Sequence, residues 1–246
     1  MTTSQAATLE DTTVATSQGI LCLFDIDGTL LTTGGAGEMA LKQACLEFFG
    51  KEDTLEGIEI SGRTDTSIAR QLCTRYGLPH SSANIDGFLA RYLHHLEAQL
   101  PLKSGRLLPG VKELLATLDA HPDVRLALLT GNLHEGARIK LSHYGIWHYF
   151  PFGAFADDSH QRNELGPVAR KRALEQTGVD FPDPAVFVIG DTPHDIACGR
   201  ACGAQTIAVA TGSHPPEELW SHEPDHFFDD FSDIARVLKT LGVIHL

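Results

Sequence analysis

A short apolar run that ends in two carboxylates is the feature that most limits how this chain folds. Leu21–Phe24 is uninterrupted hydrophobic sequence, and Asp25, Asp27 and Gly28 follow it. Four consecutive apolar residues are typical of a strand covered on both faces, as in a parallel sheet flanked by helices. In such sheets, ligands bind beyond the carboxyl ends of the strands. The run therefore predicts a central strand that leads into a catalytic site.

The two aspartates are two residues apart, so a continuing strand would place both side chains on one face. Adjacent carboxylates repel each other, and a bound cation relieves that repulsion. Because oxygen ligands favour hard cations, we expect Mg2+ to be bound by Asp25 and Asp27. The alternative is a turn that caps a following helix, which explains one carboxylate and not two.

Further apolar runs alternate with amphipathic segments in the second half of the chain. Alternating strands and helices predict an α/β fold, a Rossmann-like parallel sheet with helices on both faces. The expected strands cover residues 125–130, 152–156, 185–189 and 206–210, and the expected helices cover residues 111–118, 134–144, 165–177 and 195–202.

The stretch between the first strand and this alternating part is mostly helical. Its expected helices cover residues 38–49, 65–76 and 85–100. This pattern predicts a small helical domain, residues 35–105, inserted into an α/β core of residues 19–34 and 106–246. A glycine-rich loop precedes the insertion, and a hinge between two lobes is favoured over a phosphate-binding loop.

Composition excludes several classes of function. The formal net charge of -13 opposes binding to nucleic acid. No run approaches the ~20 apolar residues that cross a bilayer, so no membrane partner is expected. Residues 1–18 are Thr/Ser/Ala-rich, which predicts a flexible tail without a secretory signal. Five scattered cysteines indicate reduced thiols and a cytoplasmic protein, and Cys198 and Cys202 lack the His partner of a metal site.

A second strand end carries a hydroxyl and an amide. Thr130 ends the apolar run Leu126–Leu129, and Gly131 and Asn132 follow, just before an expected helix. A hydroxyl beside an unobstructed glycine N–H at a helix N-terminus suits phosphate binding. Capping of that helix by Thr130 or Asn132 explains the same residues. The residues alone leave both interpretations open.

A third apolar run, Val186–Ile189, leads into Gly190 and Asp191, and Asp195 comes four residues after Asp191. One turn of helix separates the two carboxylates, so both can reach a cation held by Asp25. Asp195 also suits the positive end of a helix dipole. Capping alone explains Asp195 but not Asp191, so we expect both in the metal site.

Taken in order, these motifs resemble those of the haloacid dehalogenase superfamily, in particular its phosphatase branch. The sequence contains both Asp-x-Asp-Gly-Thr and Gly-Asp-x-x-x-Asp, each after an apolar strand. The resemblance implies a helical cap over the active site and a Mg2+ ion bound directly by Asp191. It assigns Thr130 to phosphate binding with Asn132 as a helper, and leaves Asp195 acting directly or through water.

The superfamily also places a basic residue ahead of the second acidic motif, where it neutralises the nucleophile and the transferring phosphoryl group. Arg162 is our choice, because Pro167 follows it where many relatives carry a proline-rich stretch. Its rivals are Arg170, Lys171 and Arg172. They fall in the middle of an expected helix, where a charge usually faces solvent.

In the expected cap, Ser61–Asp65 begins a helix with Thr64 or Asp65 as the N-cap residue. Capped relatives have a loop near this position that reaches the substrate. The resemblance therefore makes Arg63 a candidate contact for a polar or anionic leaving group.

The resemblance implies hydrolysis of a small phosphate monoester, phosphoglycolate-like or a sugar phosphate, through an aspartyl-phosphate on Asp25. Asp27 would protonate the leaving oxygen and later deprotonate water. Asp27 then contacts Mg2+ at most through its backbone carbonyl, and Asp191 supplies the second carboxylate. A phosphomutase would use the same acidic residues and return the phosphoryl group to a sugar, whereas a non-catalytic binding module would have lost one of them.

Overall fold

The computed structural model describes residues 19–244. Parallel strands form a central six-stranded sheet in the order β5-β4-β1-β6-β7-β8. These strands are β1 (Ile20–Phe24), β4 (Val124–Leu129), β5 (Gly153–Ala154), β6 (Val186–Gly190), β7 (Gln205–Val209) and β8 (His226–Phe228). The sheet confirms the expected α/β class. The expected tail, residues 1–18, lies outside the described residues.

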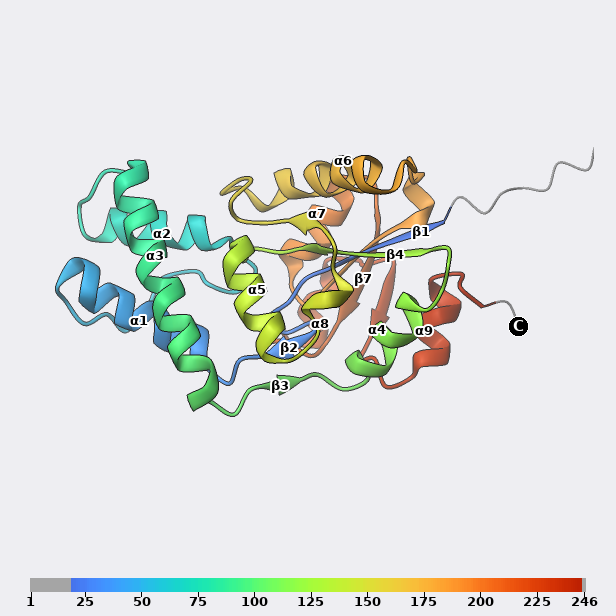
Figure 1. The fold of residues 1–246 in the computed structure, drawn as a ribbon, viewed down its shortest axis with the longest axis horizontal. Coiled ribbons are helices and arrows are strands. Elements are labelled where there is room, and N and C mark those ends of the chain that lie inside the picture. Colours follow the sequence, from blue (N-terminus) through green and yellow to red (C-terminus); the bar gives the residue numbers. More distant parts are fainter. Residues whose placement is uncertain (1–18, 245–246) are drawn as a thin grey trace, which may run out of the picture.

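Helices cover both faces of the sheet (Figure 1). They are α4 (Val111–Asp119), α5 (His134–His143), α6 (Leu165–Thr177), α7 (Pro193–Ala201), α8 (Pro216–Ser221) and α9 (Ile234–Thr240). Side chains of β1 alternate between the faces: Leu21 and Leu23 belong to the apolar cluster that includes α6, whereas Cys22 and Phe24 belong to the cluster that includes α4. Burial on both faces explains why β1 is apolar throughout.

The inserted helices are α1 (Ala36–Phe49), α2 (Asp65–Arg75) and α3 (Ser82–Gln99). They form an apolar cluster that contains Leu72, Phe88 and Leu96 and extends to Leu133 and Ile139 of the core. The chain leaves and re-enters the core through the antiparallel pair β2 (Leu31–Thr32) and β3 (Arg106–Leu107). In Figure 1, these blue and green helices lie beyond one end of the sheet.

The hydrophobic periodicity of the sequence does not predict the bounds of several short elements. The strand expected at residues 152–156 is reduced to β5, and β8 is an edge strand of three residues. Helix α7 begins two residues earlier than expected, at Pro193, because Thr192 caps it and proline suits the first helical position. Such short segments carry too few residues for a period to be counted.

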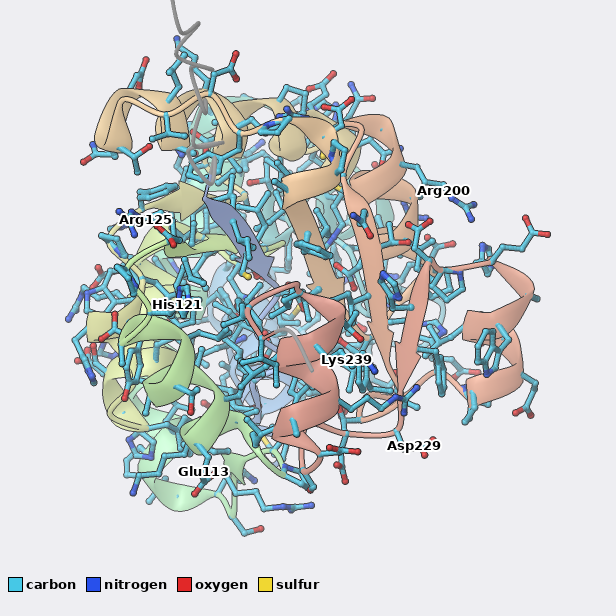
Figure 2. All side chains as sticks on the ribbon, turned by 90° about the vertical axis from the view of Figure 1, so that its right-hand side faces the viewer. Glu113, His121, Arg125, Arg200, Asp229 and Lys239 are labelled. Atoms are coloured by element: carbon cyan, nitrogen blue, oxygen red, sulfur yellow. The ribbon has the colours of Figure 1, made fainter. Side chains whose placement is uncertain are left out.

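The carboxyl ends of β1, β4 and β6 meet at the edge of the sheet that faces the inserted helices, so Asp25, Thr130 and Asp191 follow the strands at one end of the core (Figure 1). Figure 2 looks at the opposite end, where Glu113 and Lys239 are exposed on α4 and α9. Within residues 19–244, no helix combines the length and apolar character that a membrane crossing requires.

All five cysteines are free, and Cys202 alone among them is less than fully buried. Burial raises the pKa of Cys22 and of Cys198 to about 12, so both are inert thiols. The Cys198 thiol lies 3.2 Å from the Arg162 carbonyl oxygen and donates to it. The cysteines thus behave as small core residues.

Candidate active site

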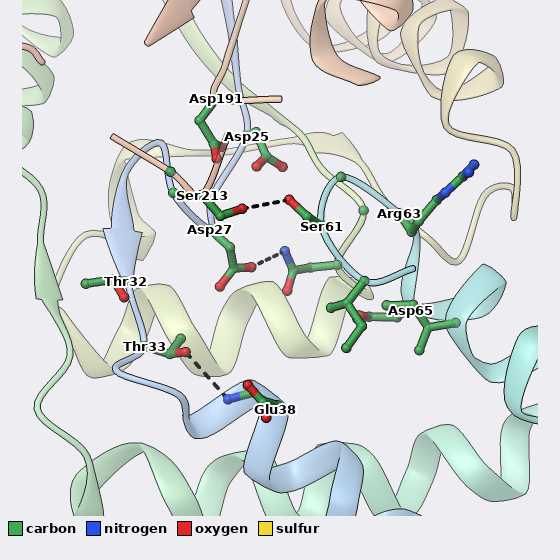
Figure 3. Close-up of a pocket in the computed structure, with 18 of the residues that line it drawn as sticks. Asp25, Asp27, Thr32, Thr33, Glu38, Ser61, Arg63, Asp65, Asp191 and Ser213 are labelled. Carbon is green, nitrogen blue, oxygen red and sulfur yellow. Dashed lines mark hydrogen bonds between the residues drawn. The ribbon is translucent and has the colours of Figure 1, made fainter. Parts of the chain in front are cut away.

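A cavity of about 530 Å³ lies between the strand ends and the inserted helices (Figure 3). Residues predicted from separate motifs line it together: Asp25, Asp27, Arg63, Gly131, Asn132, Arg162 and Asp191. Thr130 and Asp195 are buried beside it and are absent from its lining. The fold therefore gathers the polar residues of three strand ends around one space.

Three buried carboxylates form an acidic cluster in this site. Asp25, Asp191 and Asp195 each offer a carboxylate oxygen within 4.8 Å of the others. Asp25 follows β1, Asp191 follows β6, and Asp195 lies in the first turn of α7. The Thr29 hydroxyl donates to Asp191 Oδ1 over 2.9 Å, which orients that carboxylate. Clustered carboxylate oxygens are the ligand set of a hard divalent cation.

The charge balance supports the same interpretation. Burial raises the pKa of Asp25 to about 6, although the Arg162 guanidinium partly opposes this effect. Burial, followed by the charges of Asp195 and Asp25, raises the pKa of Asp191 well above its ordinary value. One guanidinium leaves the three carboxylates with excess negative charge, which a divalent cation would offset.

The backbone at two glycines, Gly28 and Gly212, lies very close to the Asp191 carboxylate. A Cβ added at Gly212 would lie 1.6 Å from Asp191 Oδ2, and one added at Gly28 would lie 2.2 Å from it. Gly28 also has a φ of 85°, in the left-handed region that glycine adopts without strain. The glycine of the first motif is therefore required both by the turn and by the approach of the Asp191 carboxylate. The residues present fit a bound Mg2+ ion.

Arg162 is the basic residue that reaches the acidic cluster. It lies in a 3-10 turn just before α6, and its Nη2 donates to Asp25 Oδ1 over 2.9 Å and to Asp195 Oδ1. Its three rivals are paired elsewhere: Arg170 with Asp183, Lys171 with Glu175, and Arg172 with Asp158. Among these candidates, Arg162 has the geometry that the sequence-based choice required.

Asp195 serves two local purposes with its two oxygens. Its Oδ2 accepts hydrogen bonds from the Thr192 N–H and hydroxyl over 3.0 and 2.7 Å, which completes a capping box at the start of α7. Its Oδ1 faces Arg162. Capping therefore accounts for one oxygen and leaves the other in the acidic cluster.

Asp27 does not join that cluster. Strand β1 ends at Phe24, so the alternation that predicted a shared face for Asp25 and Asp27 stops before the second aspartate. The Asp27 carboxylate turns away from Asp25 and Asp191 (Figure 3), and its Oδ2 accepts a hydrogen bond from Asn132 Nδ2 over 2.9 Å. Within the described chain, the acidic group that could hold an ion lacks Asp27. The expectation that both side chains hold one cation is thus not met.

Lys140, which the sequence analysis missed, is the second partner of Asp27. Its Nζ lies 2.6 Å from Asp27 Oδ2 and donates to it, and its side chain is only 5% exposed. Burial alone would lower the pKa of Lys140, but Asp27, Tyr92 and Asp65 together outweigh that effect, and the pKa lies above its ordinary value. The ammonium is therefore charged inside the protein.

A signal for Lys140 exists in the sequence. It lies three residues after Ala137 and one before Leu141, both buried on α5. This spacing places a lysine on the apolar stripe of an amphipathic helix, where a charge needs a buried partner. A lysine in this apolar stripe is unusual and can be recognised from the sequence, but the stripe does not predict that its partner is Asp27.

The residues that follow β4 do not cap helix α5. Helix α5 has Leu133 as its N-cap residue with no side-chain cap, so neither Thr130 nor Asn132 caps it. The Thr130 hydroxyl accepts from Asn132 Nδ2 over 2.9 Å. A Cβ on Gly131 would lie 2.2 Å from the Arg63 carbonyl oxygen, so this glycine permits close approach of the inserted loop. Phosphate binding by these residues stays a prediction.

The inserted loop 61–65 is fastened to the core. Thr64 is the N-cap residue of α2, as one of the two expected candidates. The Asp65 N–H donates to the Gly131 carbonyl over 2.7 Å, and Asp65 Oδ2 accepts from the Leu133 N–H over 2.8 Å. The Arg63 side chain points away from Asp25 (Figure 3) and pairs with Glu59 at the surface. Its contact with a leaving group stays a prediction.

Known proteins resemble this chain in sequence and in fold. Residues 22–209 match the family model described as haloacid dehalogenase-like hydrolase. The probable phosphatase IndB of Dickeya dadantii is 27% identical over 227 residues, which cover 90% of this chain and 94% of that protein. The phosphoglycolate phosphatase of Aliivibrio fischeri is 25% identical over 228 residues, which cover 89% and 96%.

A solved structure extends the comparison to the fold. The crystal structure of CbbY from Rhodobacter sphaeroides in complex with phosphate superposes with a TM-score of 0.71 at 17% identity, covering 88% of this chain and 96% of that one. The family match spans most of the chain and includes the strand ends that carry Asp25, Thr130 and Asp191. This protein therefore belongs to the haloacid dehalogenase-like hydrolase family.

Proposed function

We propose that this enzyme is a Mg2+-dependent phosphatase that hydrolyses a small phosphate monoester through an aspartyl-phosphate on Asp25. The observation that carries the proposal is the pairing of a buried Asp25 with Arg162 inside a cluster of three carboxylates that opens onto a cavity. The phosphatase names of IndB and of the Aliivibrio fischeri protein support the same class of reaction.

In the first half-reaction, an Asp25 oxygen attacks phosphorus and the bond from phosphorus to the leaving oxygen breaks. Asp27 donates its proton to that oxygen, so an alcohol departs. Arg162 neutralises charge on Asp25 and on the transferring phosphoryl group. Mg2+ held by Asp25, Asp191 and Asp195 would add positive charge at the same place.

In the second half-reaction, Asp27 takes a proton from water as that water attacks the phosphorus of the aspartyl-phosphate. The acyl-phosphate bond breaks, inorganic phosphate leaves, and Asp25 returns to its starting state. Asp27 thereby regains the proton that it donated. Thr130, Gly131 and Asn132 are proposed to hold the phosphate oxygens during both steps.

The inserted helices act in this proposal as a cap, residues 35–105, over a core of residues 19–34 and 106–246. Loop 61–65 supports this assignment, because it is hydrogen-bonded to the core beside the cavity. A volume of about 530 Å³ suits a small metabolite such as a phosphoglycolate-like acid or a sugar phosphate.

The test is phosphate release from a panel of small phosphorylated metabolites, with Mg2+ and with EDTA. We expect at least one ester to be hydrolysed, EDTA to abolish the release and added Mg2+ to restore it. Reaction in 18O-labelled water should place one labelled oxygen in the phosphate. Transfer to a sugar hydroxyl without phosphate release would replace the proposal with a phosphomutase, and full activity in EDTA would remove Mg2+ from it.

A further inference from the structure

We propose that Lys140 is a positioning residue for Asp27: together with Asn132 it holds one carboxylate oxygen, so that the other faces the leaving group. This inference rests on the proposed phosphatase function and adds a residue that acts on one half of the chemistry, the transfer of protons to and from Asp27.

The hydrogen bonds on Asp27 are unevenly divided between its oxygens. Asn132 Nδ2 and Lys140 Nζ both donate to Oδ2, over 2.9 and 2.6 Å. Oδ1 receives no hydrogen bond from residues 19–244. The Asp27 side chain is nevertheless 42% exposed and lines the cavity. One oxygen is anchored, and the other is available to a proton on the substrate or on water.

Lys140 also sets the orientation of Asn132. Its Nζ donates to Asn132 Oδ1 over 2.6 Å, while Asn132 Nδ2 donates to Asp27 Oδ2 and to the Thr130 hydroxyl over 2.9 Å each. An amide flipped by half a turn would place NH2 against the ammonium and lose these bonds. Lys140 therefore acts on Asp27 twice, directly and by fixing the amide that binds it.

Stability alone gives little reason for a lysine at this position. Burying an ammonium is costly, and an apolar side chain of similar length is often as stable or more so in a protein interior. Lys140 lies on a helix face whose neighbours Ala137 and Leu141 are apolar. The buried Lys140 ammonium pairs with the partly exposed Asp27 carboxylate, whereas the Arg162 guanidinium pairs with the buried Asp25 carboxylate. This arrangement indicates a function in the cavity.

The experiment compares two substrates in the Lys140→Met variant. Asp27 must protonate the alkoxide that leaves an alkyl phosphate, whereas 4-nitrophenolate leaves 4-nitrophenyl phosphate without a proton. We expect kcat/KM, which reports the phosphorylation of Asp25 and not the later hydrolysis shared by both esters, to fall at least about 10-fold more for the alkyl ester than for the nitrophenyl ester. Lys171→Met is the matched control, since Lys171 is 76% exposed on α6. It should leave both rates unchanged.

Two further variants separate positioning from folding. Lys140→Arg keeps the positive charge and should recover part of the alkyl-ester rate. In an Asp27→Asn background, Lys140→Met should cause no further loss of leaving-group selectivity, because the two residues act as a unit. A crystal structure of Lys140→Met should show the Asp27 side chain displaced while Asp25 remains bonded to Arg162.

The possible results are distinct. Equal losses of kcat/KM on both esters, an unmoved Asp27 carboxylate, or additive losses in the double variant would each overturn the positioning role while leaving the phosphatase intact. A wild-type protein that hydrolyses neither ester would overturn both proposals.

Discussion

Asp25 lies in a buried acidic cluster, whereas Asp27, two residues later, faces the cavity. The Asp25 side chain is 8% exposed and shares Arg162 with Asp195. The Asp27 side chain is 42% exposed and is bonded to Lys140. Strand β1 ends at Phe24, so the alternation of a strand does not extend to Asp27, and the two carboxylates meet different partners.

The divergence separates two electrostatic tasks. Around Asp25, negative charge exceeds positive charge, which suits a site that recruits a divalent cation and then a phosphoryl group. Around Asp27, a buried ammonium pairs with the carboxylate, which suits a group that exchanges protons without binding metal. The following predictions test this contrast, from the largest expected effect to the smallest.

Asp25→Asn should reduce phosphate release by at least about 10⁴-fold, because the amide cannot form the covalent intermediate. The reduction should be the same for alkyl and nitrophenyl esters. The measurement is steady-state phosphate release, with the thermal unfolding midpoint as a check on folding. Sustained turnover by the pure variant would remove Asp25 from the role of nucleophile.

Asp27→Asn should lower the rate on alkyl esters by about 10²–10⁴-fold, the range typical of general acid-base catalysis. The nitrophenyl ester should still phosphorylate Asp25, so acid-quenched enzyme should retain labelled phosphate because hydrolysis of the intermediate is slowed. If Asp27→Asn instead matched Asp25→Asn on every ester and trapped no intermediate, the two aspartates would not have separate tasks.

Asp191→Asn should raise the Mg2+ concentration that gives half-maximal activity by at least about 10-fold, because one anionic ligand is lost. Titration of Mg2+ against activity and against the unfolding midpoint measures this shift. Asp27→Asn is the comparison: it should leave the Mg2+ concentration dependence of the midpoint unchanged. A similar shift in both variants would show that Asp27 also binds the metal through its side chain.

Asp65, which lies beside Lys140, should control part of the pH dependence of stability. Burial raises its pKa from 3.8 to about 6. Because the folded state then holds the proton more tightly than the unfolded state, the free energy of unfolding should fall as pH rises from about 4 to about 6, by up to ~3 kcal/mol. Asp65→Asn should match wild type near pH 4 and be more stable near pH 7.

Urea unfolding at a series of pH values measures this difference. Asp86→Asn on α3 is the control, since it removes a carboxylate that is exposed. An Asp65→Asn variant with the same pH dependence as wild type would show that Asp65 is ionised at no energetic cost in the folded protein.

The strand ends could be predicted from the sequence because the physics there is local. A strand buried on both faces must be apolar, and the first polar residues after it lie where ligands bind in a parallel sheet. This reasoning correctly located Asp25, Thr130 and Asp191 at one end of the core. It failed for the side-chain direction of Asp27, because strand alternation was extended past the last strand residue.

By itself, the sequence determined the α/β class, the helical insertion, and the apolar strands that lead to the carboxylates. Only the tertiary structure decided that the Lys140 ammonium meets Asp27, and it placed Arg162, the basic residue chosen from the family resemblance, against Asp25 and Asp195. Arg162 lies 137 residues from Asp25, and Lys140 lies 113 residues from Asp27. These pairs depend on how helices pack against the sheet, and periodicity reports only which face of a helix is buried, not which side chain it will meet there.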